Sequence, residues 1–129
     1  MKPQLKATGN FKIGRNSAEL ENIPIFIIKE DNVIIYYSPV FDLSGYGANE
    51  SEAEKSLQIS IEEFFKYTLN KKTLDTELSK LGWVKPKRKR KKRYNPPVMS
   101  DMIQMHDYLS EIINHHDFRK ETMPIVVPA

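Results

Sequence analysis

The residues of this chain that could carry out chemistry are its carboxylates and its three histidines. A two-metal nuclease needs several carboxylates that converge on divalent cations from the ends of neighbouring strands. Only Asp31 and Asp42 lie beside the strands that the sequence predicts, and Asp31 falls within a turn. We therefore expect neither a catalytic site nor an enzymatic activity.

The histidines His106, His115 and His116 do not have the spacing of a metal site. Two histidines that share one zinc ion on a helix stand four residues apart, whereas adjacent histidines project to different sides. These positions are more typical of solvated residues at a helix end. The chain has no cysteine, no serine in a G-x-S-x-G turn and no glycine-rich loop followed by lysine. We expect no metal and no cofactor.

A run of cationic side chains, KPKRKRKKR at residues 85–93, is the strongest charge feature of the sequence. It could neutralise several phosphates and so bind nucleic acid with little dependence on base sequence. Trp83 and Tyr94 flank the run and could stack on an unpaired base. The candidate nucleic-acid-binding residues are Lys85, Lys87, Arg88, Lys89, Arg90, Lys91, Lys92 and Arg93.

The same run has a simpler interpretation, because a block of like charges is most often a solvated linker. It could also tether the acidic remainder of the same or another subunit. Without these eight residues the chain holds 12 basic and 17 acidic side chains, a formal charge of −5. The net charge of +3 thus combines an acidic body with one concentrated cationic segment. Each part suits a different partner.

The start of the chain, MKPQLKATGN, lacks the apolar core of a signal peptide. No stretch approaches the roughly 18 apolar residues of a membrane-spanning helix. With 129 residues, of which 40% are hydrophobic, the chain is large enough for one domain with its own core. These features predict a cytoplasmic protein that does not enter membranes.

A β-hairpin is predicted where two apolar runs, residues 25–28 and 33–37, flank a polar turn at residues 30–32. The runs are continuous rather than alternating, so both faces of these strands should be covered. We expect helices on one face and a second sheet or a second subunit on the other. A homo-oligomer, either a dimer or a larger assembly, is the expected consequence.

A capped helix should follow a short third strand or bulged turn at Gly45 and Gly47, where glycine permits backbone angles that other residues resist. Asn49 is a suitable N-cap, and Glu52 can complete a capping box. The same pair recurs two residues later, as Ser51 and Glu54. The helix should run to about Leu69, with an apolar stripe of Ala53, Leu57, Ile61, Phe64 and Phe65.

The rest of the chain is predicted to be mainly helical. A short helix from Thr73 should end at Gly82, and Trp83 could begin another strand. Beyond two prolines, apolar spacing predicts one helix over residues 98–112, with Ser100 as its cap, and the terminal PIVVPA could add as an edge strand. The chain would then comprise an α+β domain (1–84), a basic, proline-containing linker (85–97), and a segment (98–129) that serves dimerisation or extends the same domain.

The predicted fold class is α+β: a small antiparallel sheet of three to four strands with one main helix packed on it, plus a C-terminal helix and a terminal strand. The first twenty residues are weakly patterned and are expected to be irregular or to form a short strand.

One segment carries a family pattern: an aromatic-rich strand, a proline, an acidic residue, a Leu-x-Gly step, a helix-capping turn residue, and acidic residues just before an alanine. The residues in these places are Tyr37, Pro39, Asp42, Leu43, Gly45, Asn49, Glu50, Glu52 and Ala53. With this pattern, residues 33–65 resemble the HicB family of toxin-neutralising antitoxins. Two places depart from it, because Val40 and Phe41 separate the proline from the acid and Ser44 stands where a second proline is common.

The resemblance implies a degenerate ribonuclease-H-like sheet with a helix packed on it, in a bacterial protein that binds a small basic toxin ribonuclease and covers its RNA site. Many members also regulate their operon through a C-terminal DNA-binding domain. The region after Pro97 offers no recognisable pair of helices with a turn, so this property is not carried over. Each residue of the pattern also has a structural role, because it ends a strand, forms a turn, caps a helix or allows close packing. The pattern therefore supports the fold more than the function.

Two functions remain open. The first is an antitoxin-like protein that docks a small basic toxin. The second is a nucleic-acid-binding regulator that acts through residues 85–93. A third hypothesis is a HicB-like domain that has no toxin partner.

Overall fold

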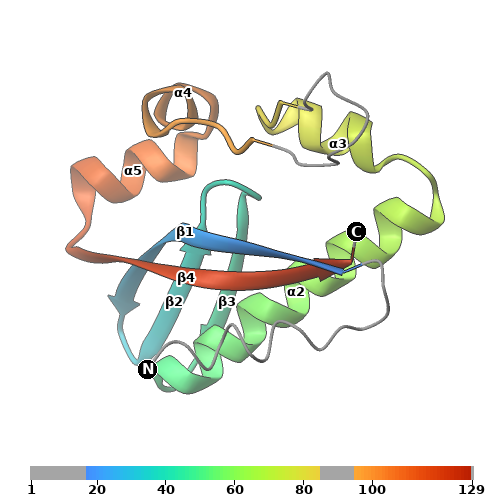
Figure 1. Cartoon of the computed structure of the whole chain (residues 1–129). Coiled ribbons are helices and arrows are strands. Elements are labelled where there is room, and N and C mark those ends of the chain that lie inside the picture. Colours follow the sequence, from blue (N-terminus) through green and yellow to red (C-terminus); the bar gives the residue numbers. More distant parts are fainter. Residues whose placement is uncertain (1–16, 85–94, 129) are drawn as a thin grey trace.

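The computed structural model describes residues 17–84 and 95–128 and contains one antiparallel sheet with strand order β3-β2-β1-β4 (Figure 1). The strands are β1 (Ser17–Glu30), β2 (Val33–Ser38), β3 (Leu43–Gly47) and β4 (Phe118–Pro128). The helices are α2 (Glu50–Asn70), α3 (Leu74–Lys80), α4 (Met99–Met105) and α5 (Asp107–His115). The predicted α+β class, with a small antiparallel sheet, a main helix and a terminal strand, is confirmed.

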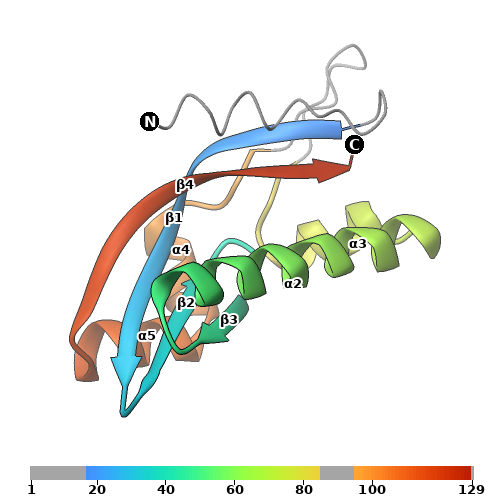
Figure 2. The same ribbon diagram turned by 90° about the horizontal axis from the view of Figure 1, so that it is seen from below.

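Strand β1 lies at the centre of the sheet and pairs along both edges. Its second half pairs with β2 from Phe26 to Glu30, while nearly its whole length pairs with β4, the last strand of the chain. A bulge interrupts the β4 pairing near Asn22, whose φ of 59° is left-handed. Beyond the end of β2 the two long strands continue as a ribbon (Figure 2). The first and last described segments of the chain are therefore held together.

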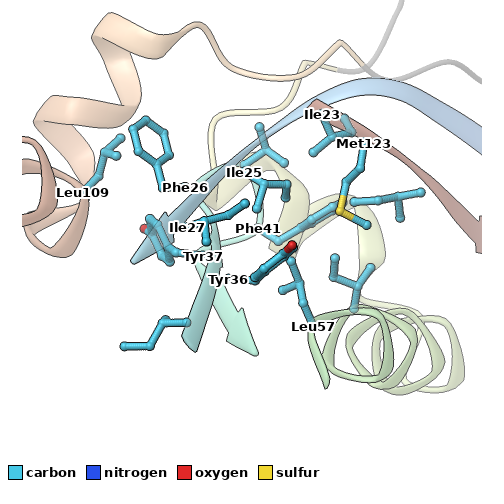
Figure 3. Close-up of a cluster of buried hydrophobic side chains, with 14 of the residues drawn as sticks. Ile23, Ile25, Phe26, Ile27, Tyr36, Tyr37, Phe41, Leu57, Leu109 and Met123 are labelled. Carbon is cyan, nitrogen blue, oxygen red and sulfur yellow. The ribbon is translucent and has the colours of Figure 1, made fainter. Parts of the chain in front are cut away.

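The apolar runs of β1 and β2 are buried on both faces, as their continuous pattern predicts, except for the exposed Val33 at the start of β2. Tyr36 lies on the side of α2, where Leu57 packs, and Phe26 and Tyr37 lie on the opposite side, toward Leu109 of α5 (Figure 3). The expectation that a second sheet or subunit covers the second face is wrong, because α4 and α5 of the same chain already bury it. The burial of these strands therefore does not require an oligomer.

Helix α2 starts where the sequence predicts. The side chain of Asn49 accepts a hydrogen bond from the amide of Glu52 (2.9 Å), and the Glu52 carboxylate accepts one from the amide of Ala48 (2.9 Å). The first bond satisfies an amide that the first turn of a helix leaves without a partner, and the second ties the residue before the cap to that turn. The cap is Asn49 rather than the pair two residues later.

Gly45 and Gly47 lie in a regular strand, and their backbone angles are not the reason for glycine there. The reason is close packing against α2. A Cβ atom on Gly45 would stand 2.2 Å from the amide nitrogen of Leu57, and one on Gly47 would stand 2.6 Å from that of Ala53. Such distances are far inside van der Waals contact, so any side chain would push the helix away from the strand.

The C-terminal half departs from the predicted single helix. His106 adopts an extended conformation (φ −115°, ψ 108°) and divides the helix into α4 and α5. The break leaves Met102, Leu109 and Ile112 fully buried, whereas Val98 and Met105 of the predicted stripe are exposed. Ser100 is not the cap, because α4 begins at Met99 without a side-chain cap.

Two further differences concern strands and turns. The first hairpin has a two-residue turn, Asp31 and Asn32, since Glu30 already pairs with Val33. Strand β4 begins at Phe118, well before the PIVVPA segment, and Val84 forms only an isolated bridge. No helix in the described part of the chain is long and apolar enough to cross a membrane.

We predict that Gly45→Ala destabilises the fold by about 3 kcal/mol, because the added methyl group would meet backbone atoms of α2 that cannot rotate away. Urea denaturation measures the change. The control is Ser44→Ala, at the preceding residue of the same strand. This change adds no atom and should lower the free energy of unfolding by less than about 1 kcal/mol. Equal stability of the two variants would show that α2 does not depend on the missing side chain.

Candidate functional site

The residues that carry the family pattern meet at the junction of β2, β3 and the start of α2. Pro39 and Gly45 are buried, Ala53 is fully buried against β3, and Asn49 caps the helix. Leu43 and Gly45 pair with Ser38 and Tyr36 of β2. The patterned segment thus forms one structural unit in which each residue has a packing or hydrogen-bonding role.

Helix α2 also covers the outer edge of β3 through two serines one turn apart. The amide of Tyr46 donates to the hydroxyl of Ser56 (3.1 Å), and the hydroxyl of Ser60 donates to the carbonyl of Ser44 (3.4 Å). An edge strand normally presents such groups to solvent or to another chain. This pair was not predicted from the sequence, although serines at i and i+4 on a helix that follows a glycine-rich strand are a usable signal.

Asp42 connects the turn after β2 to a buried tyrosine and a buried histidine. The hydroxyl of Tyr37 donates to Oδ1 of Asp42 (2.6 Å), and Nδ1 of His106 lies 3.8 Å from Oδ2. Asp42 has a left-handed φ of 55°, which aspartate tolerates better than most residues. Burial raises the pKa of the Tyr37 hydroxyl, and the hydrogen bond to Asp42 raises it further.

The expectation that all three histidines are solvated residues at a helix end is wrong for His106. Its ring is buried at the junction of α4 and α5, where its backbone caps both helices. His116 lies between two carboxylates, with Nδ1 3.4 Å from Glu30 and Nε2 3.6 Å from Glu111. His115 is exposed at the last position of α5.

Asp31 and Asp42, the two carboxylates that the sequence places beside the sheet, do not converge. Asp31 precedes β2 and Asp42 follows it, so this six-residue strand separates them by about 20 Å. Within residues 17–84 and 95–128, no three histidine or acidic side chains are grouped so as to hold a metal ion. Asp42 instead accepts the hydrogen bond of a buried phenol. The arrangement supports a structural role for this carboxylate.

Glu50, at the first turn of α2, ties the helix to β4. Arg119 donates to both carboxylate oxygens of Glu50 (2.8 and 3.1 Å) and also to Glu121 (2.8 Å). Arg119 thereby lowers the pKa of Glu50. The hydroxyl of Tyr36 donates weakly to the same carboxylate (3.4 Å), and burial together with Glu50 raises the pKa of Tyr36 to about 12.

The residues that flank the basic run are held by the fold, although residues 85–94 themselves lie outside the described part of the chain. Val84 and Asn95 exchange two backbone hydrogen bonds (2.9 and 2.8 Å). Trp83 is buried, stacks on Phe41 with ring centroids 5.3 Å apart, and donates from Nε1 to the carbonyl of Val40 (2.8 Å). Trp83 is therefore a core residue, and the expectation that it could stack on a base is wrong.

No family model matches this chain, and neither a curated protein nor a solved structure does. The case for a function therefore depends on the residues and their geometry.

The raised pKa values of Tyr36 and Tyr37 predict that the fold is destabilised at alkaline pH. The folded state favours the neutral phenols, so their contribution is fully present below pH 10, the ordinary pKa, and is lost as the pH rises toward 12. Urea unfolding midpoints should fall across this range. Tyr36→Phe should reduce the fall, because this variant removes one of the two groups. A fall of the same size in the variant would contradict the assignment to Tyr36.

Proposed function

We propose that this protein is an antitoxin-like binding protein of the HicB type, which neutralises a small toxin ribonuclease by covering its RNA site. The single observation that carries the proposal is the unit of β2, β3 and α2, in which the patterned residues act together. Gly45 admits the backbone of α2, Asn49 starts the helix, and Asp42 holds Tyr37. A sequence pattern that builds one continuous scaffold supports relatedness better than separate matches would.

The scaffold is suited to binding rather than catalysis. Asp31 and Asp42 lie at opposite ends of β2, and Asp42 and Glu50 are engaged by Tyr37 and Arg119. Exposed acids remain elsewhere on α2, at Glu52, Glu62 and Glu63. An acidic surface complements a small basic partner and speeds its association. In this proposal the protein acts in the bacterial cytoplasm, where such a toxin would cleave RNA.

A second candidate function, nucleic-acid binding, is favoured by the pairing of Val84 with Asn95. These residues exchange two hydrogen bonds, and the eight cations of residues 85–93 stand between them in the sequence. A concentrated run of cations binds phosphates with an affinity that falls steeply with salt.

Helices α4 and α5 do not provide the DNA-binding domain found in many HicB proteins. Only His106 separates them, whereas a helix-turn-helix has a turn of three to four residues. Any contact with nucleic acid would thus involve the basic run and would read the backbone rather than the bases.

Co-expression tests the antitoxin proposal. The proposal requires an adjacent reading frame that encodes a short basic protein, with which the chain should form a stable complex and whose inhibition of growth it should relieve. The complex should survive size-exclusion chromatography at high salt. The control variant replaces all eight cations of residues 85–93 with glutamine and should bind equally well. Failure of both assays with the unmodified chain would rule the proposal out.

The same glutamine variant tests the second function. The unmodified chain should bind a generic single-stranded DNA, with an affinity that falls about 10- to 1000-fold between low and moderate salt. The glutamine variant should lose this binding, while Lys66→Gln, a single exposed cation on α2, should change it little. Fluorescence anisotropy measures both. Binding that survives in the glutamine variant would exclude the basic run as the site.

A further inference from the structure

A row of apolar and aromatic side chains crosses the sheet on the face that α5 covers. Phe118, Ile28, Ile35 and Tyr46 are successive cross-strand partners from β4 to β3. Partners directly opposite each other in antiparallel strands project to the same face. Ile28 and Ile35 are buried in the middle of the row, but 57% of Tyr46 is exposed at its β3 end. Helix α5 thus leaves the β3 side of this face open.

The exposed side of α5 borders this open part of the sheet. Tyr108 packs edge-on against Tyr37, with ring centroids 4.9 Å apart, and is itself 37% exposed. Burial raises the pKa of Tyr108, and Glu30, Tyr46 and Glu111 raise it further. Tyr37 also lies two residues from Ile35 on the same face of β2, and Ile35 is the cross-strand partner of Tyr46. Tyr46 of β3 and Tyr108 of α5 therefore belong to one surface.

Two carboxylates and one aliphatic residue complete the surface. Glu30 and Glu111 both contact the ring of His116, at 3.4 and 3.6 Å, which brings the β1–β2 turn and α5 together. Val33 is 41% exposed and lies diagonally from Tyr46, two residues along β2 from Ile35. We call Glu30, Val33, Tyr46, Tyr108 and Glu111 the aromatic-acidic surface.

We propose that the aromatic-acidic surface docks an arginine-bearing segment of the basic partner protein. A guanidinium stacks on tyrosine rings and donates paired hydrogen bonds to carboxylates, and this surface supplies both. The inference rests on the proposed function and specifies where the partner binds. It also explains why three large side chains, Val33, Tyr46 and Tyr108, remain exposed next to two acids.

A cationic partner fits this surface better than a second copy of the chain. A two-fold contact would apply the same surface to itself and so gather four carboxylates in one interface. Like charges at such a contact oppose association. Strand addition at β3 is also disfavoured, because Ser56 and Ser60 already bond its outer edge. Recognition here therefore depends on side chains.

Amide chemical-shift mapping of the full chain tests the inference with a capped oligo-arginine peptide as the probe. The largest shifts should fall at Tyr46, Tyr108 and Glu111. An oligo-lysine peptide of equal length should bind more weakly, because an ammonium group does not stack as a planar guanidinium does. Tyr46→Ala and Glu111→Gln should each weaken oligo-arginine binding roughly three- to fivefold.

The matched controls are Tyr67→Ala on α2 and Asp101→Asn on α4, which alter a similarly exposed tyrosine and an exposed acid outside the aromatic-acidic surface. They should leave the peptide affinity unchanged. Shifts centred on α2, or equal losses in the controls, would overturn the inference and leave the co-expression result intact. If neutralising residues 85–93 alone moves the Tyr46 and Tyr108 signals, the surface binds the chain's own basic run, and the inference is wrong.

Discussion

The structure depends on the burial of strand β1 on all sides. Residues 23–28 are almost continuously apolar, and β1 pairs along one edge with β2 and along the other with β4. Fully burying one such side chain contributes about 1.5–3 kcal/mol, so neither face can remain in water. Helix α2 must therefore cover one face and α5 the other. The remaining contacts of the molecule hold these two helices in place.

Each helix is positioned by a different means. Helix α2 lies against glycines of β3 and is tied to β4 by the pair of Glu50 and Arg119. Helix α5 is placed by its buried Leu109 and Ile112 and by the break at His106. Because α5 is only nine residues long, it covers β1 and β2 but not the Tyr46 end of the sheet. The aromatic-acidic surface results from this limited coverage.

The sheet edges show how partners can and cannot approach. Pro24 lies opposite Thr122 and has no amide hydrogen, so this pair cannot exchange two bonds, and the backbone groups of Thr122 face the open edge of β4. By alternation, Lys120 faces the same way. A lysine at a sheet edge is a common means of preventing strand addition. Ser56 and Ser60 bond the outer edge of β3, and the outer edge of β4 is protected in this way. A partner is therefore more readily bound by side chains than by addition of a strand to the sheet.

Local sequence signals predicted the elements that local physics determines. The cap at Asn49, the stripe of α2 and the apolar runs of the first hairpin were all recognised, because capping and periodicity act over a few residues. The start of β4 was not recognised, since Arg119 and Lys120 look like a charged loop. Their strand state depends on pairing with Ile27 and Phe26, more than ninety residues earlier. The role of Trp83 was missed for the same reason, as its partner is Val40.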